Sequence, residues 1–352
     1  MKRSFKILFL GETYRADAIT WMNGIKEFGG FELITWELQN SEKNYKKIFR
    51  ALEVFFRLRE LRNFIVKEKP DLIIAERITS YGFIGCLFHK YAPVIVAQQG
   101  VTDIYPPNSF SVPIKLMMQH FVFKNATLIH AWGNIMTYSM LKQGCKPSKI
   151  MVLSKGIDLR KFTFDNQHTS DTLKAIVTRS LSDDYRHNTI LKAFKILKER
   201  NIPFQLTVIG TGNLETSLKQ LAHKEGIEQE VTFSGKIDNS ILPDYLKSHD
   251  VYVSMPVTEG VSASLFEAMA TGCYPIVSRL PGTEAWITDL VNGRLIEVDN
   301  AAALADALEW YYANKQSLNS VVQKNRALIE RLANYEVNMN IISQTYKSLC
   351  AE

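Results

Sequence analysis

Short apolar runs alternate with longer amphipathic stretches through most of the 352-residue chain. Short apolar runs bounded by turn residues are typical of buried strands, and the longer stretches have the 3.6-residue period of helices. This alternation predicts parallel sheets covered by helices, which is an α/β architecture. We expect strands over residues 6–10, 31–36, 72–75, 94–97 and 127–130 in a first unit, and over residues 173–178, 205–209, 231–234, 251–254, 274–277 and 295–298 in a second.

A polar stretch over residues 164–172 separates the two units. A chain of this length suits two domains. We therefore expect an N-terminal domain over residues 1–164 and a C-terminal domain over residues 165–334, both Rossmann-like. Residues 335–352 are expected to form a terminal helix.

The composition, 46% hydrophobic and 22% charged, is that of a globular protein. No apolar run approaches the ~20 residues that span a bilayer, and the run at residues 7–10 is too short for the core of a signal peptide. We expect a cytoplasmic protein. The cysteines are far apart and form no zinc motif, so we expect small buried side chains at Cys86, Cys145, Cys273 and Cys350.

Charge is divided unevenly between the two halves. Residues 1–164 carry 24 basic and 13 acidic residues, a net charge of +11, and the remainder carries 18 basic and 23 acidic residues, a net charge of −5. A basic half indicates an anionic neighbour. Because the chain has no nucleic-acid-binding motif, we favour an anionic membrane surface over nucleic acid, with peripheral association at the inner face of the cell membrane.

The clearest chemical signal is the segment EGVSASLFE at residues 259–267, which follows an apolar run typical of a strand. Gly260 permits a tight turn, and Ser262 suits the N-cap of a helix. Free amides and the positive end of the dipole at such a helix start bind phosphate. Glu259 and Glu267 could accept hydrogen bonds from sugar hydroxyls. The pattern predicts a nucleotide-sugar site; the alternative is an ordinary strand–helix corner with two solvated acids.

The same segment resembles the signature of the retaining glycosyltransferases of family four. That signature is two Glu with seven residues between them, then Ala-Met-Ala, Gly and Pro-Ile or Pro-Val; here it stands as Glu259, Glu267, residues 268–270, Gly272 and residues 275–277. The resemblance covers roughly residues 155–300 well and the first 150 in outline. It implies the GT-B fold, an α/β fold of two Rossmann-like domains facing across a cleft. The first domain would bind the acceptor, the second would bind the nucleotide sugar, and the last helix would cross back to the first.

The resemblance also implies roles for individual residues. Glu267 would bind the ribose and Glu259 the transferred hexose, while Arg179 would stabilise the charge of the departing diphosphate. Glu259 and Arg179 are therefore the expected catalytic residues. No cofactor or metal ion is expected, since cations and helix dipoles would stabilise the diphosphate. The backbone expected to cradle the hexose and diphosphate comes from Gly260, Val261, Ser262, Ala263 and Ser264.

Two further turns of the second unit carry weaker signals. Gly210 and Gly212 close a strand. Taken alone they are typical of a plain strand–helix turn, whereas in the family glycines here line the nucleotide cleft. Lys236 and Ile237 follow the next strand, where the family places the nucleobase, and Ile237 is the best candidate for a backbone contact. A surface turn is the alternative. Because such contacts are made by the backbone, the donor base, uridine or guanosine, stays open.

One expected cation of the second unit is replaced. Family members carry a Lys five or six residues after Arg179, and this chain has Tyr185 there. Arg186 could supply the missing charge; the alternative is a solvated loop residue.

The first unit departs further from the family. Gly11 stands in a loop that in the family has two glycines and approaches the ligand. Gln99 replaces a His that touches the transferred sugar, and an amide can bind a hydroxyl but cannot act as an acid or base. Asp103 could bind donor or acceptor hydroxyls or cap a turn. We interpret Trp21 and His130 as core residues.

Residues 44–69 form a basic stretch with a helical stripe of apolar residues, which consists of Ala51, Val54, Leu58, Leu61 and Ile65. Phe49, Leu52 and Phe56 lie off that stripe. A basic helix with such aromatic residues could lie on anionic lipid; a solvated face of a Rossmann-like unit is the alternative.

These observations predict a metal-independent, retaining hexosyltransferase. It would use a UDP- or GDP-linked sugar and a saccharide or lipid-linked acceptor, in the assembly of cell-surface polysaccharide such as lipopolysaccharide or capsule, or of lipid-linked oligosaccharide. The alternatives are a nucleotide-sugar epimerase and an inactive, membrane-associated GT-B partner subunit. A dehydrogenase is disfavoured because no Gly-x-Gly-x-x-Gly follows the first strand.

Overall fold

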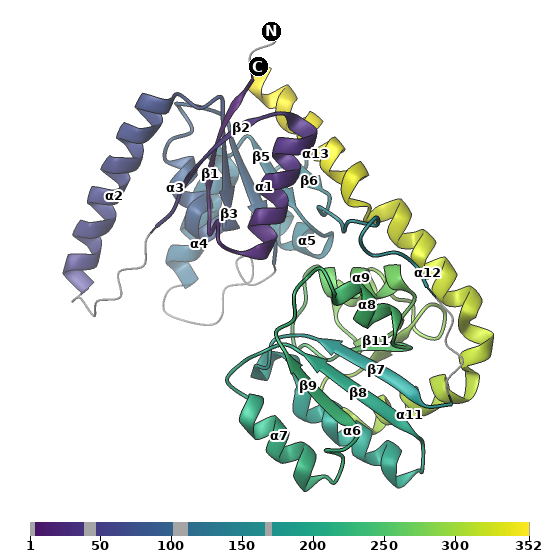
Figure 1. Ribbon diagram of the computed structural model, residues 1–352. Coiled ribbons are helices and arrows are strands. Elements are labelled where there is room, and N and C mark those ends of the chain that lie inside the picture. The colour runs from purple at the N-terminus through teal and green to yellow at the C-terminus, as the bar shows by residue number, and fades with distance from the viewer. Residues whose placement is uncertain (1–3, 39–46, 101–111, 166–170, 352) are drawn as a thin grey trace. The chain divides into compact units, whose positions relative to one another are not determined.

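The computed structural model describes residues 4–38, 47–100, 112–165 and 171–351, with the backbone alone described for residues 47–55. The chain forms two compact units (Figure 1). Residues Met1–Lys155 and Glu336–Glu352 make the first, and Gly156–Tyr335 make the second. The first unit therefore ends earlier in the sequence than the polar stretch suggests, and it contains nearly all of the terminal helix.

The first unit is built on a six-stranded parallel sheet with the strand order β2-β1-β3-β4-β5-β6. Its strands are β1 (Lys6–Leu10), β2 (Glu32–Trp36), β3 (Leu72–Glu76), β4 (Val94–Gln98), β5 (Leu128–Ala131) and β6 (Ile150–Val152). Its helices are α1 (Ala16–Gly29), α2 (Lys47–Glu68), α3 (Phe83–Cys86), α4 (Val112–Asn125), α5 (Ile135–Lys142) and α13 (Tyr335–Ala351), with the short η1 (Arg77–Gly82) and η2 (Pro147–Lys149).

The second unit is built on a second six-stranded parallel sheet, with the strand order β12-β11-β10-β7-β8-β9. Its strands are β7 (Leu173–Thr178), β8 (Phe204–Ile209), β9 (Val231–Gly235), β10 (Val251–Ser254), β11 (Tyr274–Ser278) and β12 (Arg294–Ile296). Its helices are α6 (His187–Glu199), α7 (Glu215–Lys224), α8 (Leu242–Lys247), α9 (Ala263–Thr271), α10 (Pro281–Glu284), α11 (Ala301–Asn314) and α12 (Asn319–Leu332), with the short η3 (Asp183–Tyr185) and η4 (Lys315–Leu318).

The apolar strands of the second unit are buried on both faces. Along β7, Ala175 and Val177 face a core that also contains residues of α6, α7 and α11. Ile176, between them, faces a second core that contains residues of α8, α9 and α12. This alternation follows the two-residue period of a strand. Figure 1 shows α6, α7 and α11 on one side of this sheet and α8 and α9 on the other. The prediction of parallel α/β units is confirmed.

The direction of winding reverses once in each sheet. In the first unit it reverses between β1 and β3, and in the second between β7 and β10. Because all strands are parallel, their carboxyl ends share one edge of each sheet. In open α/β sheets ligands bind outside these ends, at the point where the strand order reverses. The loops after β1, β3, β7 and β10 are therefore where each unit can build a site.

The helix predicted near residues 44–69 is present as α2. Leu61 and Ile65 of its apolar stripe are buried, and Phe56, off the stripe, is 62% exposed. Phe49 and Leu52 lie where only the backbone is described. Among the described residues, no helix is both long enough and apolar enough to cross a membrane.

Candidate functional site

The loop after β10 leads directly into the amino end of α9. Ser262 is the N-cap of α9, and its buried hydroxyl accepts a hydrogen bond from the Leu265 amide at 3.3 Å. Gly272 ends the helix in the left-handed conformation, with φ of 107°. The sequence predicts this strand, turn and capped helix. The amides of Ala263 and Ser264, as the first two of the helix, have no acceptor within it.

Arg179 connects the two loops at the reversal point of the second sheet. It follows the last residue of β7, and its Nε donates to the hydroxyl of Ser254, at the end of β10, at 3.1 Å. Its Nη2 donates to the carboxylate of Glu259 and to the hydroxyl of Ser262. The Arg179 and Glu259 side chains are only 12% and 13% exposed. The result is a largely buried ion pair at the start of α9.

The environment of Arg179 keeps its guanidinium charged. Burial lowers the pKa of Arg179, but the oxygen of Tyr252 and the carboxylate of Glu259 raise it, and the net shift is upward. The ring of Tyr185 lies 5.2 Å from the guanidinium carbon. Tyr185, at the position where a second cation was expected, thus forms a cation–π contact with Arg179.

Arg186 is paired elsewhere. Its backbone is left-handed, with φ of 48°, and its Nε lies 3.0 Å from a carboxylate oxygen of Asp299, in the loop after β12. Its Nη1 donates to the carbonyl of Asp183 at 2.5 Å. Arg186 is therefore paired with the loop after β12. The cation that pairs with Glu259 is Arg179.

The glycines of the turn after β8 allow close backbone packing. Gly210 has φ of 144°, and a Cβ there would collide with the carbonyl of Arg179. A Cβ at Gly212 would collide with the carbonyl of Leu181. A Cβ at Gly282, in α10, would likewise collide with the carbonyl of Glu259. These glycines therefore let neighbouring segments pack directly against the backbone near Arg179 and Glu259.

The outer face of α9 is formed by Ala263, Ser264 and Glu267, which are partly exposed. The other residues of α9 from Leu265 to Thr271 are buried. Positions three and four residues apart share one helix face, so Glu267 lies on the same face as the first two amides. Gly260 and Val261, before the helix, are also partly exposed.

The loop after β9 begins at the carboxyl edge of the sheet, as the loops after β7, β8 and β10 do. Gly235 has φ of 65°, and its carbonyl accepts from the Gly210 amide at 2.8 Å. Lys236 is exposed, and Ile237 packs against the core under α9. The structure thus brings the loops after β7, β8, β9 and β10 together at the carboxyl edge.

The first unit has a buried carboxylate that the sequence analysis missed. Glu76 ends β3 and is 2% exposed. One of its oxygens accepts from the amide of Glu12 at 3.0 Å, and the other accepts from Nε2 of Gln99 at 3.1 Å. Burial raises the pKa of Glu76, and the two hydrogen bonds oppose that shift. A signal was present, since an acid directly follows the apolar run 72–75.

Gly11 and Arg77 complete this cluster. A Cβ at Gly11 would lie 2.6 Å from Oε2 of Glu76, so the glycine lets the loop after β1 approach the carboxylate. Arg77 forms an ion pair with Glu12 at 2.7 Å. Asp103 lies outside the described residues.

Trp21 and His130 are core residues, which confirms their interpretation. His130 is fully buried; its Nε2 donates to the carbonyl of Leu153 at 2.6 Å, and its Nδ1 accepts from the hydroxyl of Tyr346 at 2.7 Å. The Trp21 ring packs edge-on against His130 and Phe9.

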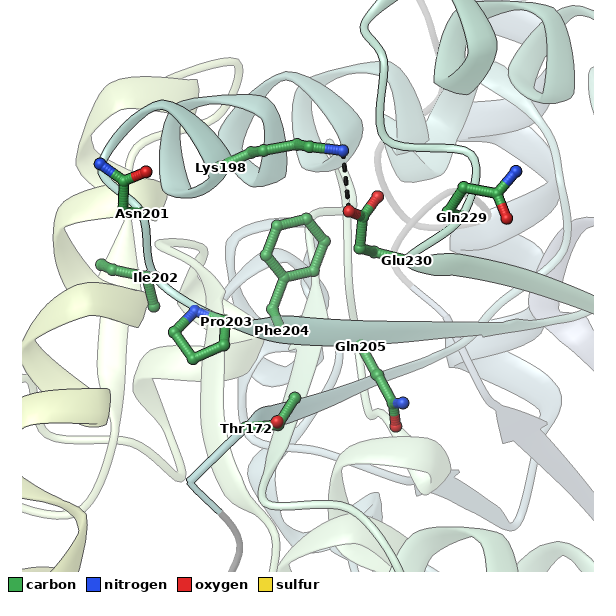
Figure 2. Close-up of a pocket in the computed structure, with 9 residues that line it drawn as sticks. All are labelled: Thr172, Lys198, Asn201, Ile202, Pro203, Phe204, Gln205, Gln229 and Glu230. Atoms are coloured by element: carbon green, nitrogen blue, oxygen red, sulfur yellow. Dashed lines mark hydrogen bonds and ion pairs between the residues drawn. The ribbon is translucent and has the colours of Figure 1, made fainter.

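An open groove of about 480 Å³ lies at the other edge of the second sheet (Figure 2). Phe204 and Gln205 start β8, so the groove lies at the amino ends of the strands, opposite the loops described above. Lys198 and Glu230 form an ion pair at 2.7 Å at its border. Its lining is Thr172, Lys198, Asn201, Ile202, Pro203, Phe204, Gln205, Gln229 and Glu230.

Most of the second unit matches a known protein family. Residues 159–328 match the family model described as "Glycosyl transferases group 1". This segment lies within the second unit and contains Arg179, Glu259 and Glu267. The two parallel α/β units are those of the GT-B fold, which confirms the predicted fold class.

The similarity to individual proteins extends over most of the chain. The amylovoran biosynthesis glycosyltransferase AmsK of Erwinia amylovora is 24% identical over 286 residues, which cover 77% of this chain and 70% of AmsK. Protein CapJ of Staphylococcus aureus is 24% identical over 319 residues, covering 87% and 76%. The structure of Anabaena Alr3699/HepE in complex with UDP has a TM-score of 0.80 at 16% identity, covering 98% of this chain and all of that one.

Proposed function

We propose that this protein is a retaining glycosyltransferase that moves a hexosyl group from a nucleotide-diphospho-sugar to a saccharide or lipid-linked acceptor. The setting we propose is the assembly of cell-surface polysaccharide. The match of residues 159–328 to a glycosyltransferase family supports the reaction class. A relative named for amylovoran biosynthesis supports the setting.

The observation that carries the proposal is the position of Arg179. It is a largely buried cation at the reversal point of the second sheet, hydrogen-bonded to the N-cap of α9. A helix start with free amides already favours an anion, and a guanidinium adds a positive charge that strengthens hydrogen bonds to phosphate oxygens. A diphosphate is the ligand that best fits both features.

Each residue of the site then has a distinct role. The amides of Ala263 and Ser264 would bind the diphosphate, and Arg179 would stabilise the negative charge that grows on it as the glycosidic bond breaks. Glu259, held by Arg179, would accept hydrogen bonds from the hexose. Glu267, on the outer face of α9, would accept hydrogen bonds from the ribose. The turns at Gly210–Gly212 and Lys236–Ile237 would border the nucleoside.

No metal ion has a role in this scheme, because the guanidinium and the helix start supply the positive potential. Retention would follow if the acceptor hydroxyl attacks the face that the diphosphate leaves, passing its proton to the departing phosphate oxygen. Gln99, which cannot accept that proton at neutral pH, is compatible with this route. We assign Gln99 to a hydroxyl of the transferred sugar of the donor, and Gly11 to the close approach of its loop to the ligand.

A screen of nucleotide sugars tests the proposal. Thermal shift against UDP- and GDP-linked hexoses should identify a stabilising donor, because a ligand that binds the folded state raises the unfolding temperature. Slow release of UDP or GDP without acceptor should follow. A sugar isomerised without transfer would indicate an epimerase instead. The absence of binding and hydrolysis with every donor would indicate an inactive GT-B subunit.

We also propose that α2 contacts an anionic membrane surface, where a lipid-linked acceptor would be found. Phe56 and Arg59 are both exposed on this helix. A basic helix with an exposed aromatic side chain is suited to the interface of an anionic bilayer.

A further inference from the structure

Glu76 and Gln99 meet at the carboxyl edge of the first sheet. Glu76 is the last residue of β3, and Gln99 follows the last residue of β4, the neighbouring strand. The Gln99 Nε2 donates to Oε1 of Glu76 at 3.1 Å. Glu76 is 2% exposed, whereas Gln99 is partly exposed. A buried carboxylate thus contacts an amide that a ligand can reach.

The contact selects one of two orientations of the Gln99 amide. Both oxygens of Glu76 act as acceptors, Oε2 toward the Glu12 amide and Oε1 toward Gln99. An acceptor at Oε1 requires the NH₂ group of Gln99 on that side. The carbonyl oxygen of Gln99 is therefore the end directed away from Glu76.

We propose that Glu76 is a positioning residue that holds Gln99 with its carbonyl oxygen toward the ligand. Position 99 then accepts a hydrogen bond, and it selects ligands that offer a donor there, such as a sugar hydroxyl. The inference rests on the proposed function, in which Gln99 binds the sugar of the donor. Glu76 acts through Gln99 without contacting the ligand.

A purely structural role for Glu76 is the competing explanation. Its Oε2 contacts the loop at Gly11 and Glu12, so a change at Glu76 could simply disturb that loop. The two oxygens serve different partners, and this separates the explanations. In Glu76→Gln, the new side chain can accept from the Glu12 amide with its oxygen, and its NH₂ group then faces Gln99. The Gln99 amide must turn over and present its NH₂ group to the ligand.

The reciprocal exchange, Glu76→Gln with Gln99→Glu, restores the original pattern. The Gln side chain at position 76 accepts from Glu12 and donates to the carboxylate at position 99. That carboxylate again presents an acceptor outward. The exchange is expected to rescue a positioning defect, whereas a defect confined to the loop at Glu12 would persist.

Calorimetric titration with UDP and UDP-glucose, or with the nucleotide and sugar donor that the screen selects, measures the effect. The quantity of interest is the dissociation constant of the free nucleotide divided by that of the nucleotide sugar. Because the free nucleotide lacks the sugar, this ratio falls when a contact to the sugar is lost. Gln99→Ala and Glu76→Gln should each weaken the nucleotide sugar relative to the nucleotide about three- to ten-fold, as expected for one hydrogen bond. The exchange variant should recover most of that loss.

Glu12→Gln is the matched control, since it removes the ion pair with Arg77 but leaves the backbone amide that Glu76 binds. Its ratio should equal that of the wild-type protein. The inference is overturned if Glu76→Gln leaves the ratio unchanged while Gln99→Ala lowers it, or if the exchange variant is no better than Glu76→Gln. If the wild-type protein binds no nucleotide sugar at all, it is the proposed function that fails.

Discussion

Arg179 and Glu259 form a largely buried ion pair across the point where the second sheet reverses its winding. Arg179 follows β7 and Glu259 follows β10, and the two strands are neighbours in the sheet. Ser262, which caps α9, accepts from the same guanidinium nitrogen. The pair therefore fixes the acid at the start of the helix where we propose that the diphosphate binds.

Removal of Glu259 should reduce turnover more than it reduces stability. Glu259→Ala removes a charged hydrogen bond to the hexose and leaves Arg179 without its partner carboxylate. We expect kcat/KM for the donor to fall about 30- to 150-fold, which corresponds to ~2–3 kcal/mol. Asp299→Ala, which likewise removes the carboxylate partner of an arginine, Arg186, should leave turnover within about twofold. Equal losses in the two variants would contradict the assignment.

Substitution of Gly210 should disturb both the fold and the site. A Cβ there would collide with the carbonyl of Arg179, and φ of 144° is strained for any side chain. Gly210→Ala should lower the free energy of unfolding by about 2–4 kcal/mol and weaken donor binding. Gly226 has φ of 70° with no atom near its Cβ position, so Gly226→Ala should cost about 1 kcal/mol with donor binding unchanged. Chemical unfolding and calorimetry distinguish the two; the prediction is wrong if both variants bind the donor normally.

The strands were predictable because a parallel sheet buries both faces of each strand. An uninterrupted apolar run such as residues 72–75 therefore indicates where a strand lies. The capped start of α9 was also predictable, because Ser262 and Gly272 act on residues close to them in sequence. The roles assigned to Glu259, Glu267 and the neighbouring amides stay predictions, since they concern a ligand.

The partners of Glu76 and Arg186 could not be predicted. Glu76 binds the amide of Glu12, 64 residues earlier, and Arg186 binds Asp299, 113 residues later. Such contacts depend on strand order, which local patterns do not encode. The end of the first unit at Lys155 also depends on long-range contacts, because the loop after β6 is tied to α13, where Asn338 donates to the Ser154 carbonyl at 2.9 Å.

Removal of Glu267 should weaken nucleotide binding with little effect on stability. Its side chain is partly exposed on the outer face of α9, and Ala has a higher helix propensity than Glu. Glu267→Ala should raise the dissociation constant of the free nucleotide about tenfold or more, because the ribose is present in the nucleotide as well as in the donor. Calorimetry with UDP or GDP measures this. Unchanged nucleotide affinity would place the ribose elsewhere.

Vesicle sedimentation tests the proposed membrane contact of α2. The protein should pellet with vesicles that contain anionic lipid and not with neutral vesicles, and Phe56→Ser should reduce the bound fraction. Ile241→Ser is a control in the second unit, at a residue that is 44% exposed, and it should bind like the wild-type protein. Negligible binding of the wild-type protein to both vesicle types would reject the contact.

The stability of the first unit should depend on pH through His130. Burial lowers the pKa of His130 to about 4, whereas in the unfolded chain it is about 6.5. Below pH 6.5 the unfolded state therefore binds more protons, so the stabilisation is complete above that pH and is lost as the pH falls toward 4. The full loss is about 3 kcal/mol. Hydrogen exchange of β5 amides at several pH values, compared between the wild-type protein and His130→Gln, measures the difference. The difference between the two should shrink as the pH falls through this window, and a constant difference would show that His130 does not titrate there.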